Sequence, residues 1–177
     1  MIITVDDFKT YAGIDTDDDD EAIELILPGV IAWSEAFCSN SIKAKEFVEI
    51  FDGNSDDLFL ENTTNIKNIK VDQYRNGGWV ELEEWEYVAF IEGGMVMLQA
   101  RVDGYRNYRV TYTAGFEAEN LPLDLKLAIL KIMGKIWNKR KSDGIQNEKF
   151  ADAQIIWEED LSDPAFKVIL KYRLYGI

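Results

Sequence analysis

The segment Tyr108-Arg109-Val110-Thr111-Tyr112-Thr113-Ala114-Gly115-Phe116 leads into the segment Leu121-Pro122-Leu123-Asp124-Leu125-Lys126-Leu127-Ala128-Ile129-Leu130. In the first segment, large or β-branched residues alternate with polar ones, which predicts a β-strand over residues 108–113. In the second, Pro122 stands where a first helical turn begins, and leucine and isoleucine recur at helical spacing. Bases suit a helix C-terminus, so the helix is expected to end in Lys139-Arg140-Lys141. The chain therefore switches from strand to helix at this point.

Upstream of this switch, residues 44–113 have the patterns of short antiparallel strands. Asn76-Gly77-Gly78 and Glu92-Gly93-Gly94 each separate two apolar runs, and glycine and asparagine accept the positive φ angles of hairpin turns. The expected strands span residues 45–51, 58–60, 66–75, 79–82, 87–91, 95–100 and 108–113.

The two ends of the chain have helical patterns. Thr4 can cap a short helix over residues 5–12, and Gly13 is placed to end it. A longer helix is expected from the acidic run 17–21 to about Ser39, with a kink caused by Pro28-Gly29. A last helix over about residues 164–173 is predicted from Ser162-Asp163-Pro164, a cap followed by proline.

The order of these segments predicts an α+β protein. We expect a mainly α-helical bundle, built from the N- and C-terminal segments, with a central antiparallel β insertion. The corresponding domains are residues 1–43 and 116–177 for the helical bundle and residues 44–115 for the β insertion.

The charge of the chain is −14 and is unevenly distributed. Residues 1–62 hold 16 acids and 3 bases, giving −13, whereas residues 121–145 hold 2 acids and 6 bases, giving +4. Such an acidic chain is not expected to bind nucleic acid through phosphate contacts, although it could surround DNA without holding it. The asymmetry suits a subunit that sets an acidic face against a basic one, and a solvated acidic surface explains it equally well.

The sequence offers little material for catalysis. Histidine is absent, which excludes histidine-based triads and metal sites, and Cys38 is the single cysteine. The acidic run lacks the glycine and the final glutamate of a calcium loop when Asp15 is placed first. Carboxylates in residues 81–86 are more typical of a solvated strand edge than of a glycosidase pair. We therefore predict no enzyme, no cofactor and no metal, and we see no signal peptide or membrane-spanning segment.

Aromatic residues in the β zone leave one alternative open. They could form a stacking face of a carbohydrate- or peptide-binding module, or they could be cross-strand core pairs. The residues concerned are Trp79, Trp85, Tyr87, Tyr105, Tyr108 and Tyr112.

Several segments resemble one known family when taken in order. They are Ile2-Ile3-Thr4-Val5-Asp6-Asp7-Phe8-Lys9-Thr10-Tyr11-Ala12-Gly13-Ile14, the acids 17–20, Ala32-Trp33-Ser34-Glu35-Ala36-Phe37-Cys38, the passage 110–130 quoted in part above, and Trp137-Asn138-Lys139-Arg140-Lys141. Together they resemble the head–tail connector (adaptor) proteins of tailed bacteriophages, the small ring-forming subunits beneath the portal. The resemblance covers residues 1–141, and Pro28-Gly29 departs from the family's uninterrupted helix.

This resemblance implies a structural virion protein at the head–tail interface, made in the host cytoplasm. Such subunits assemble as a ring, usually dodecameric, on the portal protein, extend the channel for passing double-stranded DNA and offer a docking surface for a stopper or tail protein. We expect the channel or the subunit contacts to use an acidic surface of Asp17, Asp18, Asp19, Asp20, Glu21, Glu81, Glu83, Glu84 and Glu86. The candidate basic interface is Lys139, Arg140 and Lys141, and the candidate portal-contacting tail is Tyr172, Leu174, Tyr175 and Ile177.

Overall fold

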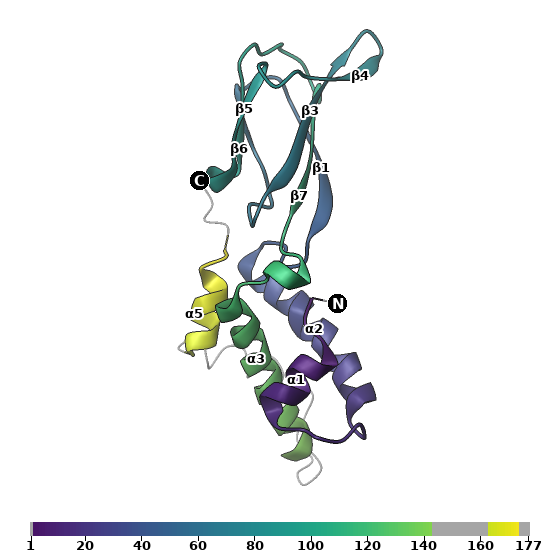
Figure 1. Cartoon of the computed structure of the whole chain (residues 1–177). Coiled ribbons are helices and arrows are strands. Elements are labelled where there is room, and N and C mark those ends of the chain that lie inside the picture. Colours follow the sequence, from purple (N-terminus) through teal and green to yellow (C-terminus); the bar gives the residue numbers. More distant parts are fainter. Residues whose placement is uncertain (1, 143–162, 174–177) are drawn as a thin grey trace. The chain divides into compact units, whose positions relative to one another are not determined.

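A computed structural model describes residues 2–142 and 163–173 of the chain. These residues fall into two compact units. The helical unit comprises residues 2–38, 118–142 and 163–173, and the β unit comprises residues 39–117. Figure 1 shows their helices and strands along the chain.

Four α-helices make up the described part of the helical unit: α1 (Val5–Ala12), α2 (Asp20–Cys38), α3 (Leu123–Ser142) and α5 (Pro164–Leu170). Their apolar faces form a common core, because helical residues three and four apart share one face. The Phe8 ring meets Trp137 edge-on at 5.7 Å, and Phe166 meets Trp33 edge-on at 5.5 Å. Short helix η2 (Ala118–Asn120) precedes α3.

Local capping chemistry explains where α1 begins and ends. The backbone N–H of Asp7 donates to the Thr4 hydroxyl at 3.1 Å, and the N–H of Thr4 donates to the Asp7 carboxylate at 2.9 Å. This reciprocal capping box satisfies amide groups that a helix start leaves open. Gly13 ends the helix with a φ of 67°, which glycine tolerates best. The predicted helix over residues 5–12 is confirmed.

The β unit contains a four-stranded sheet in the order β1-β7-β3-β4 and a three-stranded sheet in the order β2-β6-β5, both antiparallel. The strands are β1 (Lys45–Phe51), β2 (Asp57–Phe59), β3 (Lys67–Arg75), β4 (Gly78–Glu81), β5 (Tyr87–Phe90), β6 (Met95–Leu98) and β7 (Tyr108–Ala114), with η1 (Ile91–Gly93) between β5 and β6. Both hairpins predicted from glycine-containing turns are present, β3–β4 and β5–β6.

Inward-facing side chains of both sheets share one core. Tyr108, Val110 and Tyr112 on β7 are fully buried, and they belong to the same apolar cluster as Leu58 on β2 and Val96 on β6. Because successive residues of a strand face opposite sides, the residues between them point away from this core. The β unit is therefore a two-sheet sandwich with two outer faces.

The predicted α+β class is confirmed, but the prediction of a mainly helical protein is not supported. Residues 45–114 build two sheets with a core of their own, so strands are a substantial part of the fold. Helix α2 runs from Asp20 to Cys38 with Pro28 inside it, as expected, and the kink at Pro28-Gly29 stays a prediction. The domain boundaries expected after residues 43 and 115 stay a prediction.

Candidate interaction surfaces

The acidic run before α2 is held by bases of the same chain. Lys9 on α1 forms ion pairs with Asp17 at 2.5 Å and with Asp20 at 2.9 Å. Arg140 near the end of α3 forms an ion pair with Asp19 at 2.9 Å. The hydrogen bond from Lys9 holds the pKa of the Asp17 carboxyl below its usual value. Much of the charge that sequence analysis assigned to a contact surface is thus matched inside the subunit.

Fewer bases of the predicted basic interface are therefore available to a partner subunit. The Arg140 guanidinium lies 3.9 Å from the ring centroid of Trp137 while it pairs with Asp19, so both its planar face and its edge have partners. Lys139 is exposed, and the side chain of Lys141 lies outside the described residues. Asp18 and Glu21 of the acidic run are exposed, and neither takes part in the ion pairs that Lys9 and Arg140 form with this run.

The second predicted acidic set lies in the β unit, and its members differ in environment. Glu86 accepts hydrogen bonds from the backbone N–H of Glu83 at 2.8 Å and from Arg75 at 3.1 Å. These two bonds, the backbone one first, lower the pKa of the Glu86 carboxyl. Glu81 lies 3.8 Å from Lys70, whereas Glu83 and Glu84 are exposed. Glu86 therefore shapes the loop after β4, and Glu83 and Glu84 offer charge to solvent.

Of the predicted portal-contacting tail, only Tyr172 falls within the described residues; Leu174, Tyr175 and Ile177 lie outside them. The Tyr172 hydroxyl donates a hydrogen bond to Asp124 at the start of α3, at 2.9 Å. Burial, and then the bond to this carboxylate, raise the pKa of Tyr172 to about 12. Tyr172 is therefore held by its own helical unit.

The aromatic residues of the β zone do not form one exposed strip. Tyr108 and Tyr112 have no exposed surface, and each hydroxyl is used inside the unit. The Tyr108 hydroxyl accepts from Gln73 at 3.1 Å, and the Tyr112 hydroxyl donates to Glu49. Cross-strand core packing is thus the outcome for these two residues, which removes them from any ligand-stacking face.

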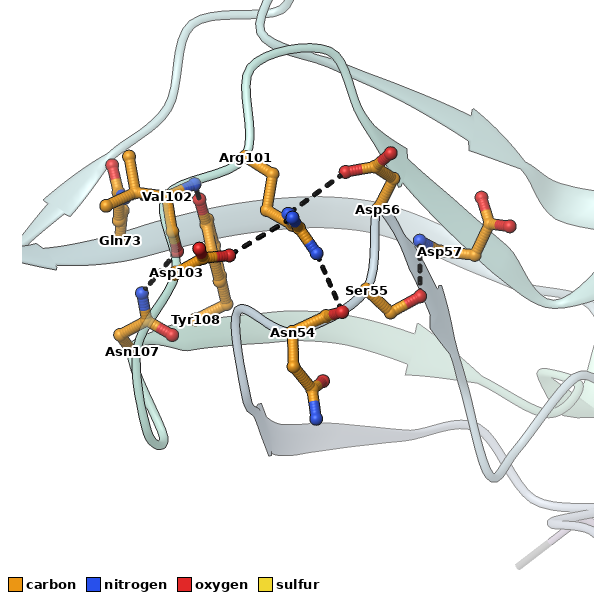
Figure 2. A network of polar contacts seen from close by, with 10 residues as sticks. All are labelled: Asn54, Ser55, Asp56, Asp57, Gln73, Arg101, Val102, Asp103, Asn107 and Tyr108. Atoms are coloured by element: carbon orange, nitrogen blue, oxygen red, sulfur yellow. Dashed lines mark hydrogen bonds and ion pairs between the residues drawn. The ribbon is translucent and has the colours of Figure 1, made fainter.

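Tyr108 also fastens the loop that precedes β7 at one end of the sandwich (Figure 2). Its hydroxyl accepts from the backbone N–H of Val102 at 2.8 Å, and the Asn107 side chain donates to the Val102 carbonyl at 2.8 Å. Arg101 reaches across to the turn between β1 and β2, where it pairs with Asp56 at 3.3 Å and donates to the Asn54 carbonyl at 2.7 Å. We call residues 99–107 the tip loop.

The tip loop presents two apolar side chains to solvent on this fixed backbone. Tyr105 is 81% exposed and Val102 is 51% exposed. Beside Tyr105 is an open cavity of about 430 Å³. Its lining residues are Ile50, Phe51, Asp52, Asn54, Ser55, Asp57, Leu58, Tyr105 and Arg106. Sequence analysis missed this region, because Asn54 and Asp56 lie 45 or more positions from Arg101 and no local motif joins them to it.

The described residues contain no group of three or more histidine, cysteine, aspartate or glutamate side chains placed to hold a metal ion. Within the same residues, no helix has the length and apolar character needed to cross a bilayer. Cys38 is buried at the end of α2.

Comparison with known proteins gives a family and a fold. The model of the family described as head completion protein matches residues 1–173. No curated protein has a significantly similar sequence. A chain in the neck of an empty gene transfer agent particle, computed with C6 symmetry, has the same fold, with a TM-score of 0.67 at 15% identity over 99% of this chain and 91% of that one.

Two further structures of gene transfer agents contain chains of the same fold. A chain in the neck of the native particle, computed with C12 symmetry, gives a TM-score of 0.63 at 15% identity over 98% of this chain and 89% of that one. A chain in the virion of the native particle gives a TM-score of 0.65 at 15% identity, covering 99% and 91% of the two chains.

Proposed function

Because the chain belongs to the head completion protein family, we propose that it acts as a non-enzymatic connector subunit between the head and the tail. The family match over residues 1–173 is the observation that carries this proposal, and it confirms the resemblance to head–tail connector proteins drawn from the sequence. The chain is accordingly a structural protein of the virion, located at the head–tail interface.

The subunit works as one copy of a ring. Support comes from chains of the same fold in particle necks whose structures were computed with C6 and C12 symmetry. In a ring, each subunit contact is repeated by the number of copies, so modest interfaces give a firm assembly. A dodecamer is the stoichiometry we propose, docked on the portal protein at one end and on a stopper or tail protein at the other. The helical and β units serve as its two domains.

An acidic wall would let double-stranded DNA pass through this ring without adhering. The charge of −14 favours such a wall, because an acidic surface repels the phosphate backbone. Ion pairs within the subunit neutralise part of the run 17–20, so the exposed carboxylates of Asp18, Glu21, Glu83 and Glu84 are the best remaining contributors.

Removal of the protein tests the proposed function directly. Particles made from a genome without this reading frame should accumulate as DNA-filled heads without tails, and supplying the chain in trans should restore tailed particles. Electron microscopy counts both classes. Normal numbers of tailed particles in the absence of the chain would refute a connector role.

Charge reversal of single exposed acids tests which set faces the DNA. Asp18→Lys adds a base in the helical unit and leaves the ion pairs of Lys9 and Arg140 intact, and Glu84→Lys is its matched counterpart in the β unit. The variant whose acid faces the channel should release DNA more slowly on triggered ejection, while the other behaves as wild type. Unchanged ejection for both would contradict the acidic wall.

A further inference from the structure

The outer face of the three-stranded sheet is apolar except for Asp57, although it points away from the core. Strand register places Phe59, Met95 and Phe90 in one row across β2, β6 and β5. The next row consists of Asp57, Met97 and Val88. The alternating residues Leu58, Val96 and Leu98 are buried on the inner side, so these two rows form the outer side. We call them the methionine–phenylalanine face.

Solvent reaches much of this face. Phe59 is 45% exposed, Phe90 44% and Val88 38%, while Met95 and Met97 are partly exposed between them. An antiparallel sheet with one solvated side normally carries polar residues there. A contiguous apolar patch on a soluble protein marks an interaction site, and methionine adapts well to a partner surface.

The four-stranded sheet also has an outer face with apolar and aromatic groups. Val48 and Ile50 on edge strand β1 are 55% and 43% exposed, and Tyr74 on β3 is 50% exposed. Tyr74 meets the ring of Trp79 edge-on at 5.4 Å, and the Arg109 guanidinium lies 4.8 Å from the Trp79 ring centroid. Tryptophan, tyrosine and arginine are the residues most enriched at the centres of protein interfaces. We call this the arginine–tryptophan face.

Two pairs of opposite charges on the arginine–tryptophan face are matched within the sheet, while Glu46 on β1 is exposed on the same side. Arg109 pairs with Asp72 at 3.0 Å, and Lys70 lies 3.8 Å from Glu81 on the adjacent strand. A partner can therefore cover these groups without leaving an unpaired charge in a dry contact, which would otherwise be costly. This face is suited to meet an apolar surface such as the methionine–phenylalanine face.

The two faces lie on opposite sides of one sandwich, since the inner sides of both sheets share a single core. We propose that the methionine–phenylalanine face of one copy packs on the arginine–tryptophan face of the next copy. Two different patches on opposite sides give a head-to-tail contact, and such a contact produces a ring when the rotation closes. A contact between identical faces would instead stop at a dimer. This inference rests on the proposed ring and names the surface that closes it.

Cysteine cross-linking in assembled particles tests the order of the faces. Met97 on β6 and Thr111 on β7 lie on the middle strands of the two outer faces, and the native Cys38 is buried. The double variant Met97→Cys/Thr111→Cys, treated with a short bismaleimide, should give a ladder of dimers, trimers and higher multimers. Particles carrying an equal mixture of the two single variants should yield dimers only, and wild type should yield none.

The outcomes separate this inference from the proposed function. Particles that contain the double variant but show no cross-linked multimers overturn the face-to-face contact and leave the connector role standing. Dimers from the Met97→Cys variant alone, without a ladder from the double variant, would show an identical-face contact and overturn it as well. Failure to find the wild-type chain in particles would remove the connector role, and the inference with it.

A charge variant provides a second measurement. Phe90→Glu buries a carboxylate in the proposed contact, and each 1.4 kcal/mol lost is a factor of ten, so we expect incorporation into particles to fall by about tenfold or more. Leu25→Glu, at a position that is 81% exposed in the helical unit, is the matched control and should incorporate normally. Circular dichroism checks that both variants fold. Normal incorporation of a folded Phe90→Glu variant would refute the proposed contact.

Discussion

Asp163 connects the start of α5 to α3 through three contacts. Its carboxylate accepts from the backbone N–H of Ala165 at 2.7 Å, from Lys131 at 3.0 Å and from Lys135 at 2.5 Å, and the side chain is 7% exposed. Burial alone would raise the pKa of Asp163, but the bonds from Lys135, Ala165 and Lys131 together lower it well below its usual value. Asp163→Ala removes all three contacts, and Asp163→Asn keeps the capping acceptor but removes the charge.

The structure sets the size of the two effects. Loss of a helix cap costs about 1 kcal/mol, and Asn caps as well as Asp does. Hydrogen bonds to charged groups contribute about 1.5–3 kcal/mol, but Lys131 and Lys135 are 42% and 34% exposed and return to water when the carboxylate is gone. We therefore expect Asp163→Ala to lower the unfolding free energy of the helical unit by about 2–3 kcal/mol, and Asp163→Asn by about 1–2 kcal/mol.

Urea unfolding followed by tryptophan fluorescence measures both values, because Trp33 packs on Phe166 next to the cap. A lowered folded-state pKa means that the ionised carboxylate stabilises the fold fully above the unfolded pKa of about 3.9 and loses this effect as the pH falls further. The difference between wild type and Asp163→Asn should therefore be full at pH 7 and shrink below about pH 4. Equal losses for the two variants at pH 7, or a difference that persists unchanged at pH 2, would refute this reasoning.

Three other substitutions have clear expectations. Burial raises the pKa of Glu49, and hydrogen bonds from Tyr112 and a backbone N–H offset this rise only partly, so the folded state loses stability as the pH rises above about 4.5 and the carboxyl ionises. Glu49→Gln should abolish this loss of stability, and equal pH slopes for wild type and variant in urea unfolding would argue against the prediction. Gly115 has a φ of +100°, and an added Cβ would lie 2.5 Å from the Lys43 carbonyl carbon, so Gly115→Ala should cost about 2–4 kcal/mol in thermal unfolding. Arg101→Ala should speed amide exchange in the tip loop while lowering global stability by less than about 1.5 kcal/mol, and unchanged exchange would show that Arg101 does not hold the loop.

Features determined by neighbouring residues were predictable from the sequence. The capping box of Thr4, the positive-φ turn at Asn76 and Gly77, and the cap and proline at Asp163-Pro164 each need only a few adjacent positions. The position of β1, which spans residues 45–51 as expected, followed in the same way from two-residue alternation. Chemistry that is local in the chain thus carried most of the fold.

Partner choice across long separations was not predictable. Arg140 lies 121 positions from Asp19, and a helix end rich in bases does not say whether its acids belong to the same subunit or to another. Pairing of β1 with β7 likewise brings Glu49 near Tyr112 from 63 positions away. Such pairs depend on which faces the fold brings together, and several alternatives satisfy the same local rules.

One signal for the methionine–phenylalanine face was present in the sequence. Residues 87–90 and 95–98 are apolar at every position, whereas a strand with one solvated side alternates. Unbroken apolar runs in an antiparallel hairpin indicate that both sides of the sheet become covered. Only the structure shows that one side is covered by the core and the other is left open within the single chain.

The two units therefore contribute different forces to assembly. In the helical unit, bases such as Lys9, Lys126 and Arg140 pair with acids of the same chain, so its charges mainly fix the fold. The remaining charge of −14 acts as a field that repels other copies over about 10 Å at 0.1 M salt. Apolar attraction acts only at contact, so it outweighs this electrostatic repulsion where an existing assembly already holds copies side by side. We therefore expect a subunit built in this way to stay dispersed in solution and to close its ring on a template, which sedimentation of the purified chain would check.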